Sequence, residues 1–326
     1  QELGIQGHVG EGRMVIDYKE EPVTLAGGEV VSLRRPTYRI EDLGYGPMHP
    51  KTMMSPRLTP QMIGLGLIEA IPVESILARE DPDDRDGDGI SGRANWVWSV
   101  EDKKLMLGRF GWKAGQPSVH QQTADAFAGD IGIGSWIAPY PWGDCTATQS
   151  LCREAPHGGT PSAPNSEINA KLLELVAFYA RNLAVPPRRD PDAPDVLAGK
   201  RLFHQIGCAS CHAPSFTTGD ASPDAHLRGQ KIWPYSDFLL HDMGDGLADG
   251  RPEARADGRE WRTAPLWGIG LTEVVNGHTF FLHDGRARNL TEAILWHGGE
   301  AQRARDGFAQ LAPADRARLL AFVNSL

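Results

Sequence analysis

The sequence predicts a mainly α-helical protein with long loops and a small β-hairpin region. Apolar residues recur at the spacing of a helix over residues 166–183 and 313–326. Gly27 and Gly28 separate two short apolar runs, a pattern typical of two strands joined by a two-residue turn. These runs lie at residues 22–26 and 29–34. The 326 residues include 37 glycines and 24 prolines, so much of the remaining chain is predicted to be loop.

The first half of the chain is predicted to hold few other regular elements. We expect a short helix at residues 60–71, an acidic loop at 81–88 and loop structure over 139–165. Asn165 and Ser166 are suitable N-caps for the helix at 166–183. The predicted buried face of that helix consists of Ile168, Leu172, Leu175, Val176, Tyr179 and Leu183.

A second unit follows the proline-rich residues 185–194, which break regular structure. Asp195 is predicted to cap a helix that leads into Cys208. The helices that end the two units resemble each other, which indicates a weak internal repeat. The predicted buried residues of the second unit's first and last helices are Val196, Gly199, Phe203 and Ile206, and Leu319, Leu320, Val323 and Leu326.

Charge and hydropathy exclude several classes of partner. The net charge is −9 and the basic residues are scattered, which argues against binding to nucleic acid or to an anionic membrane surface. No apolar stretch approaches the ~18 residues that a membrane-spanning helix needs. We therefore expect no nucleic-acid partner and no membrane span.

The most informative motif is Cys208-Ala-Ser-Cys211-His212, the attachment sequence for a c-type haem. Two thiols at this spacing add to the haem vinyl groups, and the adjacent histidine binds the iron. A zinc site would need a second ligand pair, and Cys145 and Cys152 are too far apart for the usual knuckle. A thioredoxin-like pair would need a βαβ setting. The motif therefore predicts one covalently bound haem.

The sixth iron ligand decides what such a haem can do. We prefer His297, because Asn289 and Glu292 form a capping box that starts a helix with His297 on its apolar face. Gly298 ends this helix and leaves space beside the ring. Alternatively, His297 only interacts with the negative helix end. With two strong axial ligands the haem would carry electrons and bind no peroxide. The candidates downstream of the motif are His226, His241, Met243 (the runner-up, in a glycine-rich loop), His278, His283 and His297.

The two remaining cysteines, Cys145 and Cys152, lie close together in a loop. We expect them to form a disulfide in preference to two free thiols. A disulfide and a c-type haem both imply an oxidising compartment, so the protein is expected to be periplasmic or otherwise exported. The start at Gln1 instead of Met fits a mature exported protein or a piece of a longer one.

The acidic loop follows the first half of a calcium-binding template. Carboxylates recur at the template positions, Gly89 supplies the sharp turn, and the twelfth position is Asn95 where the template has Glu. We expect a structural calcium ion, with a solvated acidic turn as the alternative. The predicted ligands are Asp84, Asp86, Asp88, Ile90 and Asn95.

Several phrases resemble a known family along essentially the whole chain. They are YRIEDLGYGP at residues 38–47, GRFGWK at 108–113, EWRTAPLWGIG at 260–270, FLHDGR at 281–286 and LTEAILWH at 290–297. This combination resembles the di-haem oxidoreductase family often labelled thiol oxidoreductase. That family is related to the bacterial di-haem cytochrome c peroxidases and to the di-haem enzyme that matures methylamine dehydrogenase. The resemblance implies cytochrome c-like domains.

Residue roles follow from the resemblance by position. In the peroxidases the distal ligand lies fourteen residues after the His of the His-Asp-Gly phrase, which is His297 counted from His283; the relatives have Met or Tyr there. Trp112 matches the tryptophan that passes electrons between the haems. Gln122 and Asp130 would line the peroxide pocket, with Asp130 as acid/base. Asp130 departs from the pattern, because it comes two residues early and replaces Glu. Alternatively, Trp112 belongs to the core and the other two are surface residues.

The family's first Cys-x-x-Cys-His does not occur in this sequence. We therefore predict that residues 1–185 are the remainder of an N-terminal cytochrome c-like domain with β and loop insertions, without its haem segment. Residues 186–194 are the linker, and 195–326 form a C-terminal cytochrome c domain with one haem.

Three functions are compatible with these observations. The chain is expected to be the electron-transfer portion of a di-haem, peroxidase-like oxidoreductase, exchanging electrons with a second haem domain or a small redox protein. A stand-alone mono-haem electron-transfer module is the main alternative. A thiol or zinc protein is a third. An upstream Cys-x-x-Cys-His would favour the first, and bound zinc the third.

Overall fold

The computed structural model describes residues 10–143 and 145–326. About 30% of the chain is helical, and the strands of the described residues pair into separate two-stranded antiparallel sheets. The fold is therefore mixed, and the prediction of a mainly α protein is wrong in this respect. The strands that were not predicted are each two to four residues long, too short for an alternating pattern to be recognised.

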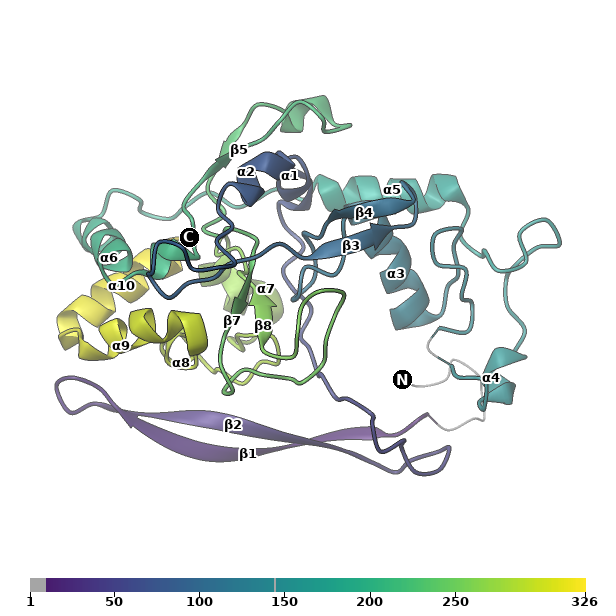
Figure 1. The fold of residues 1–326 in the computed structure, drawn as a ribbon, viewed down its shortest axis with the longest axis horizontal. Helices are drawn as coiled ribbons and strands as arrows, with labels where there is room; N and C mark the ends of the chain where they lie inside the picture. Colours follow the sequence, from purple (N-terminus) through teal and green to yellow (C-terminus); the bar gives the residue numbers. More distant parts are fainter. Residues whose placement is uncertain (1–9, 144) are drawn as a thin grey trace.

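The predicted hairpin is present and longer than expected. Strands β1 (Arg13–Thr24) and β2 (Val30–Glu41) pair in antiparallel register and run along one side of the molecule (Figure 1). Thr24 lies opposite Val30, so the turn has five residues and the predicted two-residue turn is wrong. Leu25 is the reason, because its buried side chain leaves the strand to join the core. Both turn glycines adopt positive φ.

The hairpin packs on the C-terminal helices through hydrogen bonds between residues far apart in sequence. The Ala26 N–H donates to the Ala309 carbonyl over 2.9 Å. The guanidinium of Arg316 donates to the Ala26 carbonyl over 2.9 Å and to Glu29 over 2.7 Å. Arg288 reaches the Ser32 carbonyl at 2.5 Å. These bonds therefore fasten the turn of the hairpin to residues of the last forty positions.

Short elements make up the next hundred residues. The helix expected at 60–71 is only a single short turn, because Gly64 adopts a left-handed conformation immediately before it. The elements are α1 (Leu65–Glu69), α2 (Val73–Leu77), β3 (Trp96–Ser99), β4 (Lys104–Leu107), α3 (Val119–Ile131) and α4 (Ser150–Arg153).

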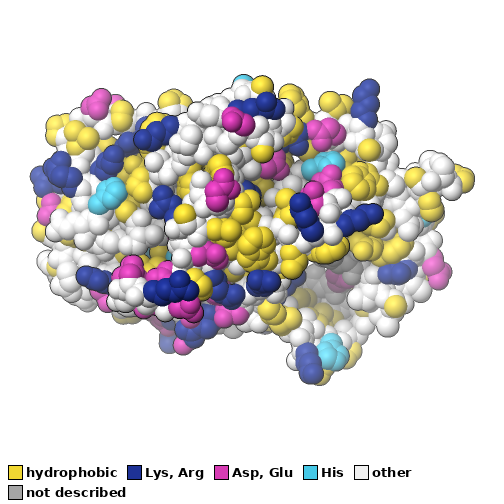
Figure 2. All heavy atoms as spheres, turned by 45° about the horizontal axis from the view of Figure 1, so that its top comes forward, with side chains coloured by type: hydrophobic (Ala, Val, Ile, Leu, Met, Phe, Trp, Pro, Cys, Tyr) yellow, Lys and Arg dark blue, Asp and Glu magenta, His cyan; other side chains and the backbone are white. Residues whose placement is uncertain are grey.

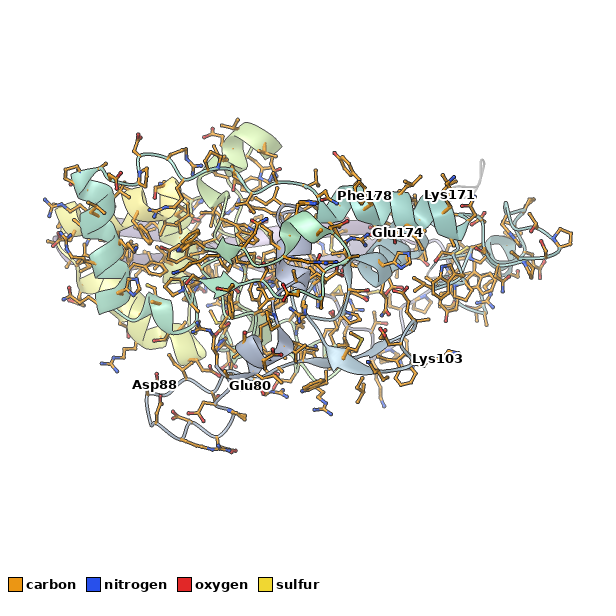
Figure 3. The ribbon with its side chains drawn as sticks, turned by 90° about the horizontal axis from the view of Figure 1, so that it is seen from above. Glu80, Asp88, Lys103, Lys171, Glu174 and Phe178 are labelled. Atoms are coloured by element: carbon orange, nitrogen blue, oxygen red, sulfur yellow. A yellow bond between two sulfur atoms is a disulfide. The ribbon has the colours of Figure 1, made fainter. Side chains whose placement is uncertain are left out.

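Helix α5 (Ala170–Arg181) is shorter than predicted and turns a different face inward. Asn169 caps it, since its side chain accepts the Leu172 N–H at 2.9 Å, so neither Asn165 nor Ser166 is the cap. The residues that pack inward are Leu173, Ala177 and Ala180. The larger side chains predicted to be buried are mostly exposed, with Tyr179 at 67%. Figure 3 shows this helix at the edge of the molecule, with Phe178 on its outer side.

The second unit is built around the crossing of α6 (Pro194–Gln205) and α10 (Pro313–Ser325). A Cβ added to Gly199 would overlap the Arg318 carbonyl, so glycine permits the close approach. Ala193 is the N-cap of α6 and Asp195 lies in its first turn, which corrects the predicted cap. The predicted burial of Val196, Gly199, Phe203, Leu319, Val323 and Leu326 is confirmed, whereas Ile206 and Leu320 are half-buried.

Loops and short elements connect these two helices. They are η1 (Cys208–Ser210), β5 (Phe216–Thr217), η2 (Ala225–Leu227), β6 (Lys231–Ile232), β7 (Leu240–Asp242), β8 (Glu260–Arg262), η3 (Ile269–Leu271), α7 (Thr272–Asn276), α8 (Leu290–Leu295), η4 (Gly299–Ala301) and α9 (Gln302–Gln310).

The buried cores draw on both sides of the predicted linker. The largest cluster joins Leu25 and Leu33 of the hairpin region to Phe203, Leu295 and Phe322. A second cluster joins α1 and α3 to residues after 215. On the face seen in Figure 2, acidic and basic side chains are interspersed around hydrophobic ones near the centre. Among the described residues, no helix is long and apolar enough to cross a membrane.

Candidate haem-binding site

The Cys-x-x-Cys-His motif forms a tight turn directly after α6. Gly207 adopts positive φ and ends the helix, and Cys208 to Ser210 form one 3₁₀ turn. Cys208 and Cys211 are not joined in a disulfide. Burial raises the pKa of the Cys208 thiol to about 12 and also raises that of Cys211. Zinc binding and thiol exchange both use thiolates, so this burial favours neither.

His212 is held in a defined orientation. Its Nδ1 lies 2.8 Å from the Tyr235 carbonyl oxygen and donates to it. The ring of Phe203 lies against it, with centroids 6.2 Å apart. Burial lowers the pKa of His212 to about 4, so the imidazole is neutral at physiological pH. With Nδ1 carrying the proton, Nε2 presents the lone pair that a metal requires.

His297 repeats this arrangement. It follows α8, which Asn289 caps by accepting the Glu292 N–H at 2.9 Å, so the predicted helix start is confirmed. His297 Nδ1 lies 2.8 Å from the Ala293 carbonyl oxygen. Burial lowers its pKa as well. His297 thus contacts the helix end through Nδ1 and keeps Nε2 for another partner. A contact of His297 with the helix end and a role of His297 as a metal ligand are therefore compatible, because they use different ring nitrogens.

The two histidines lie near each other. Burial is the main cause of the low pKa of His212, and the charge of His297 contributes to it. Each of these two rings forms its hydrogen bond through Nδ1, and among the described residues no protein group is hydrogen-bonded to either Nε2. Two buried, neutral imidazoles with lone pairs free at Nε2 are the donor set of a six-coordinate haem.

The other candidate ligands are engaged elsewhere or stay alternatives. Both nitrogens of His241 are occupied, by Asp237 at 2.9 Å and Glu300 at 2.6 Å. His283 stacks on Trp261 with centroids 3.7 Å apart. His226 is exposed, and its Nε2 lies 2.7 Å from the side-chain oxygen of Asn182. His278 is half-buried, and its Nδ1 accepts the Phe280 N–H. Met243 packs against the same core as Cys208 and remains the alternative sixth ligand.

The residues around His212 and His297 fit a covalently attached haem. Cys208 packs against an apolar core that includes Tyr235, Cys211 ends the same turn, and the imidazoles of His212 and His297 lie near each other. Trp296, beside His297, is 5% exposed and its indole N–H has no partner. The carboxylates of a haem are acceptors of the kind that such a buried donor lacks.

A charged cluster beside Cys211 was missing from the predicted site. Cys211 Sγ lies 3.6 Å from His241 Nδ1, and Asp237 and Glu300 hold that ring from both sides. Burial alone would lower the pKa of His241, but the hydrogen bond and charge of Asp237, with help from Cys211 and Glu300, raise it well above its usual value. Ser91 hydrogen-bonds Glu300 at 2.9 Å and so connects the acidic loop to this cluster.

The three residues carried over from the peroxidases are not brought together. Trp112 donates its Nε1–H to the Leu58 carbonyl at 2.6 Å, and its ring meets the His283 edge with centroids 6.5 Å apart. Gln122 is half-buried and Asp130 exposed, both on α3. Over residues 10–143 and 145–326, no hydrogen bond or ring contact joins Trp112 to either of them.

The acidic loop brings three of its predicted calcium ligands together. Carboxylate oxygens of Asp84, Asp86 and Asp88 lie within 4.8 Å of one another, and Ile90 donates its N–H to Asp88. The side chain of Asn95 is hydrogen-bonded to other parts of the chain, and its role as a calcium ligand stays a prediction. Its buried amide donates to the Lys113 and Glu253 carbonyls, and its oxygen accepts the Arg255 N–H. Figure 3 shows the loop with Asp88 standing out from the body of the molecule. A calcium ion there stays a prediction.

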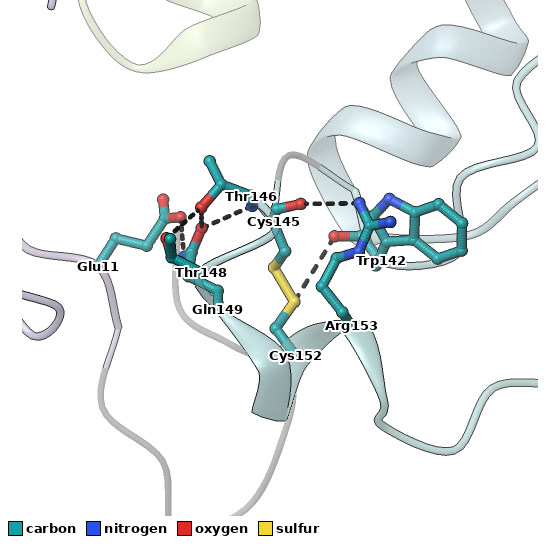
Figure 4. Close-up of a disulfide and its surroundings, with 8 residues drawn as sticks. All are labelled: Glu11, Trp142, Cys145, Thr146, Thr148, Gln149, Cys152 and Arg153. Atoms are coloured by element: carbon teal, nitrogen blue, oxygen red, sulfur yellow. Dashed lines mark hydrogen bonds between the residues drawn. A yellow bond between two sulfur atoms is a disulfide. The ribbon is translucent and has the colours of Figure 1, made fainter. Parts of the chain in front are cut away.

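The predicted disulfide is confirmed. Cys145 and Cys152 are bonded, with their Cα atoms 6.3 Å apart (Figure 4). Arg153 lies over the Trp142 ring, 4.2 Å from its centroid, and Gln149 donates to Glu11 at 2.5 Å. The bond closes a loop that holds α4 in place.

Comparison with known proteins identifies the class of protein to which this site belongs. A family model described as "di-haem oxidoreductase, putative peroxidase" matches residues 4–326. The chain belongs to this di-haem oxidoreductase family, as the sequence phrases predicted. No curated protein and no solved structure matches the chain.

Proposed function

We propose that this chain is the electron-transfer portion of a di-haem, peroxidase-like oxidoreductase. It carries one haem on Cys208, Cys211 and His212, with His297 as the sixth ligand. The matching geometry of the two histidines supports the proposal most directly. Each donates Nδ1–H to a backbone carbonyl at 2.8 Å and keeps a neutral Nε2 for iron.

The chain's own residues define what this site does. When bound, haem supplies an iron that gains and loses one electron. The carbonyls of Tyr235 and Ala293 fix the ring orientations, so the ligands need little rearrangement between oxidation states. His212 and His297 would both hold the iron, and an iron held by two strong ligands would carry electrons in preference to binding peroxide.

Trp112 is the proposed route of electrons to a second haem domain or a small redox protein. Its ring packs against the same core as Cys208 and meets the edge of His283. The proposed roles of Gln122 and Asp130 in a peroxide pocket rest on their spacing after Trp112. Because haem attachment and disulfides belong to oxidising compartments, we place the protein in the periplasm or another exported location.

Optical and low-temperature EPR spectra of the haem-loaded chain test the ligand assignment. The parent should give a low-spin, bis-histidine signal. His297→Met should give a His/Met signal and a higher midpoint potential. The matched control is His278→Met, a half-buried histidine that does not belong to the apolar core beside Cys208, which should leave the spectrum unchanged.

Two results would overturn the proposal. A high-spin, peroxide-reactive parent would mean that the sixth position is open and that this haem is itself catalytic. A low-spin spectrum unaffected by His297→Met would transfer the ligand role to another residue, and Met243→Leu would then be the variant to examine.

A further inference from the structure

Glu300 follows His297 closely in the sequence, and only two glycines separate them. Helix α8 ends at Leu295, so this part of the chain lies beyond the helix, with Glu300 in η4. Glycine restricts the backbone less than any other residue does. On this side of His297, the position of the chain therefore depends on what holds the side chain of Glu300.

The carboxylate of Glu300 accepts four hydrogen bonds. One oxygen accepts the hydroxyl of Ser91 at 2.9 Å and the backbone N–H of Asp242 at 3.1 Å. The other accepts the backbone N–H of Ser91 at 3.0 Å and the Nδ1–H of His241 at 2.6 Å. Its side chain is only 9% exposed. A buried carboxylate with so many donors keeps one position and its negative charge.

His241 connects Glu300 to the haem-attachment turn, residues 208–212. Its Nε2 donates to Asp237 at 2.9 Å, and its Nδ1 lies 3.6 Å from Cys211 Sγ. The backbone N–H of Asp237 donates to the Cys211 carbonyl at 2.9 Å. A ring that donates from both nitrogens is positively charged, and the carboxylates on its two sides stabilise that charge. A continuous path of short polar contacts therefore runs from Glu300 to Cys211.

The backbones along this path pack closely. A Cβ added to Gly299 would lie 2.1 Å from the Asp242 carbonyl oxygen, and one added to Gly92 would lie 2.7 Å from the His241 ring. Both positions therefore require glycine, and η4 packs directly beside β7. The contact between Glu300 and His241 is thus part of a tightly packed arrangement.

The two ends of this path lie next to the proposed iron ligands. Cys211 directly precedes His212, and the other end is the segment that follows His297. Because these ligands would bind the iron from opposite sides, a bond between their segments limits how far the two can move apart. We propose that Glu300 is a positioning residue for His297: by binding His241 it fastens the segment of the sixth ligand to the haem-attachment turn, and so keeps His297 on the iron. The proposal rests on the proposed function, because it takes His212 and His297 as the axial ligands.

Carbon monoxide binding to the reduced, haem-loaded chain tests this role. An iron with two protein ligands binds carbon monoxide only after one of them has left, so the rate at saturating carbon monoxide measures how often His297 leaves. Glu300→Gln keeps the shape of the side chain, but the amide nitrogen accepts no hydrogen bond, so two of the four bonds are lost. We expect carbon monoxide to bind at least about tenfold faster than in the parent.

Two further variants test the same path. Ser91→Ala removes the hydroxyl that donates to Glu300 and lies outside the segments of both ligands, so it keeps the test open if Glu300→Gln does not fold. It should bind carbon monoxide about threefold faster than the parent. His241→Gln should also be faster, and a double variant with Glu300→Gln should be no faster than the faster single variant, because both changes break one bridge.

Glu69→Gln is the matched control. Glu69 is also half-buried and accepts a backbone N–H, that of Val119 at 2.7 Å, but it joins α1 to α3, which carry no proposed haem ligand. It should leave the rate unchanged. With a low-spin, bis-histidine parent, unchanged rates in Glu300→Gln and Ser91→Ala, an equal increase in Glu69→Gln, or a double variant that multiplies the single effects would overturn the positioning role alone. A high-spin parent that binds carbon monoxide without delay would instead overturn His297 as the sixth ligand, and the role of Glu300 with it.

Discussion

His283 is a buried histidine whose protonation is costly. It stacks on Trp261, and Lys113 lies over the same indole ring at 4.5 Å. Burial lowers the pKa of His283 to about 4. The unfolded chain therefore takes up a proton at higher pH than the folded chain does. The folded protein therefore has its full stability with respect to this group above pH 6.5, where His283 is neutral in both states. It loses stability as the pH falls towards 4.

Replacing His283 with Phe should remove this pH dependence. The aromatic ring preserves the stack but cannot titrate, so the free energy of unfolding should fall less steeply between pH 6.5 and 4. The difference from the parent should reach about 3 kcal/mol at pH 4. Urea unfolding at several pH values measures it. Parallel curves for parent and variant would show that His283 titrates normally in the folded protein.

At the residue scale, local patterns supplied the candidate haem ligands, whereas a cluster of residues distant in sequence was missed. Cys208, Cys211 and His212 form one contiguous motif, and His297 was proposed from its place on a predicted helix and from the count after His283. The charged cluster of Asp237, His241 and Glu300 was not predicted, because Glu300 comes from a different element of the structure. Asn95 was assigned to the acidic loop from its spacing, whereas three distant backbone groups fix its side chain elsewhere.

The crossing of α6 and α10 depends on a glycine. Gly199→Ala would place a methyl group against the Arg318 carbonyl and force the helices apart. We expect a loss of about 1–3 kcal/mol in unfolding free energy. Gly129→Ala in α3 is the matched control, because an added Cβ there meets no atom within 4 Å and alanine favours helix. Thermal unfolding compares the two. Equal melting temperatures would contradict the close crossing.

The disulfide should stabilise its own loop more than the rest of the molecule. Replacing both Cys145 and Cys152 with Ser should lower the unfolding free energy by about 2–3 kcal/mol on the chain-entropy model. The haem spectrum should not change, because neither cysteine belongs to the haem-binding core. A change in the haem spectrum would indicate that α4 is coupled to the haem site.

At the element scale, helix existence was predictable and helix orientation was not always so. The final helix was predicted almost to the residue, since its apolar face meets α6. In α5 most of the larger apolar residues were assigned inward, but the buried ones are Leu173, Ala177 and Ala180, and the helix packs against α3 and α1. Periodicity predicts which residues of a helix form its apolar face, but the neighbouring elements determine which of these residues are buried.

For the whole molecule, the shared cores predict a single cooperative unfolding transition. Far-UV circular dichroism and the haem absorbance should change at the same temperature. The buried guanidinium of Arg316, 3% exposed, joins the first hairpin to the last helix. Arg316→Gln should lower the unfolding free energy by about 3 kcal/mol, since the carbonyls of Ala26 and Leu311 lose their donor.

Arg318→Gln is the matched control for that substitution. Arg318 lies two positions along the same helix, its side chain is 45% exposed, and its ion pairs with Asp195 and Asp315 are at the surface. Its loss should leave the free energy of unfolding nearly unchanged, because exposed ion pairs contribute little to stability. For the unaltered chain, two separate unfolding transitions, at different temperatures, would contradict the prediction of a single cooperative unit built on shared cores.

The docked hairpin also constrains the order in which the chain can fold. A two-stranded ribbon is only marginally stable by itself in water. The partners of the hairpin named above, Arg288, Ala309 and Arg316, lie in the last forty residues of the sequence, so the hairpin is synthesised long before the residues that it packs against. Contacts so distant in sequence fold slowly, and the first strands must wait for the last helix. Loss of that helix would leave the ribbon without its support, so a shortened chain is expected to be prone to aggregation and proteolysis.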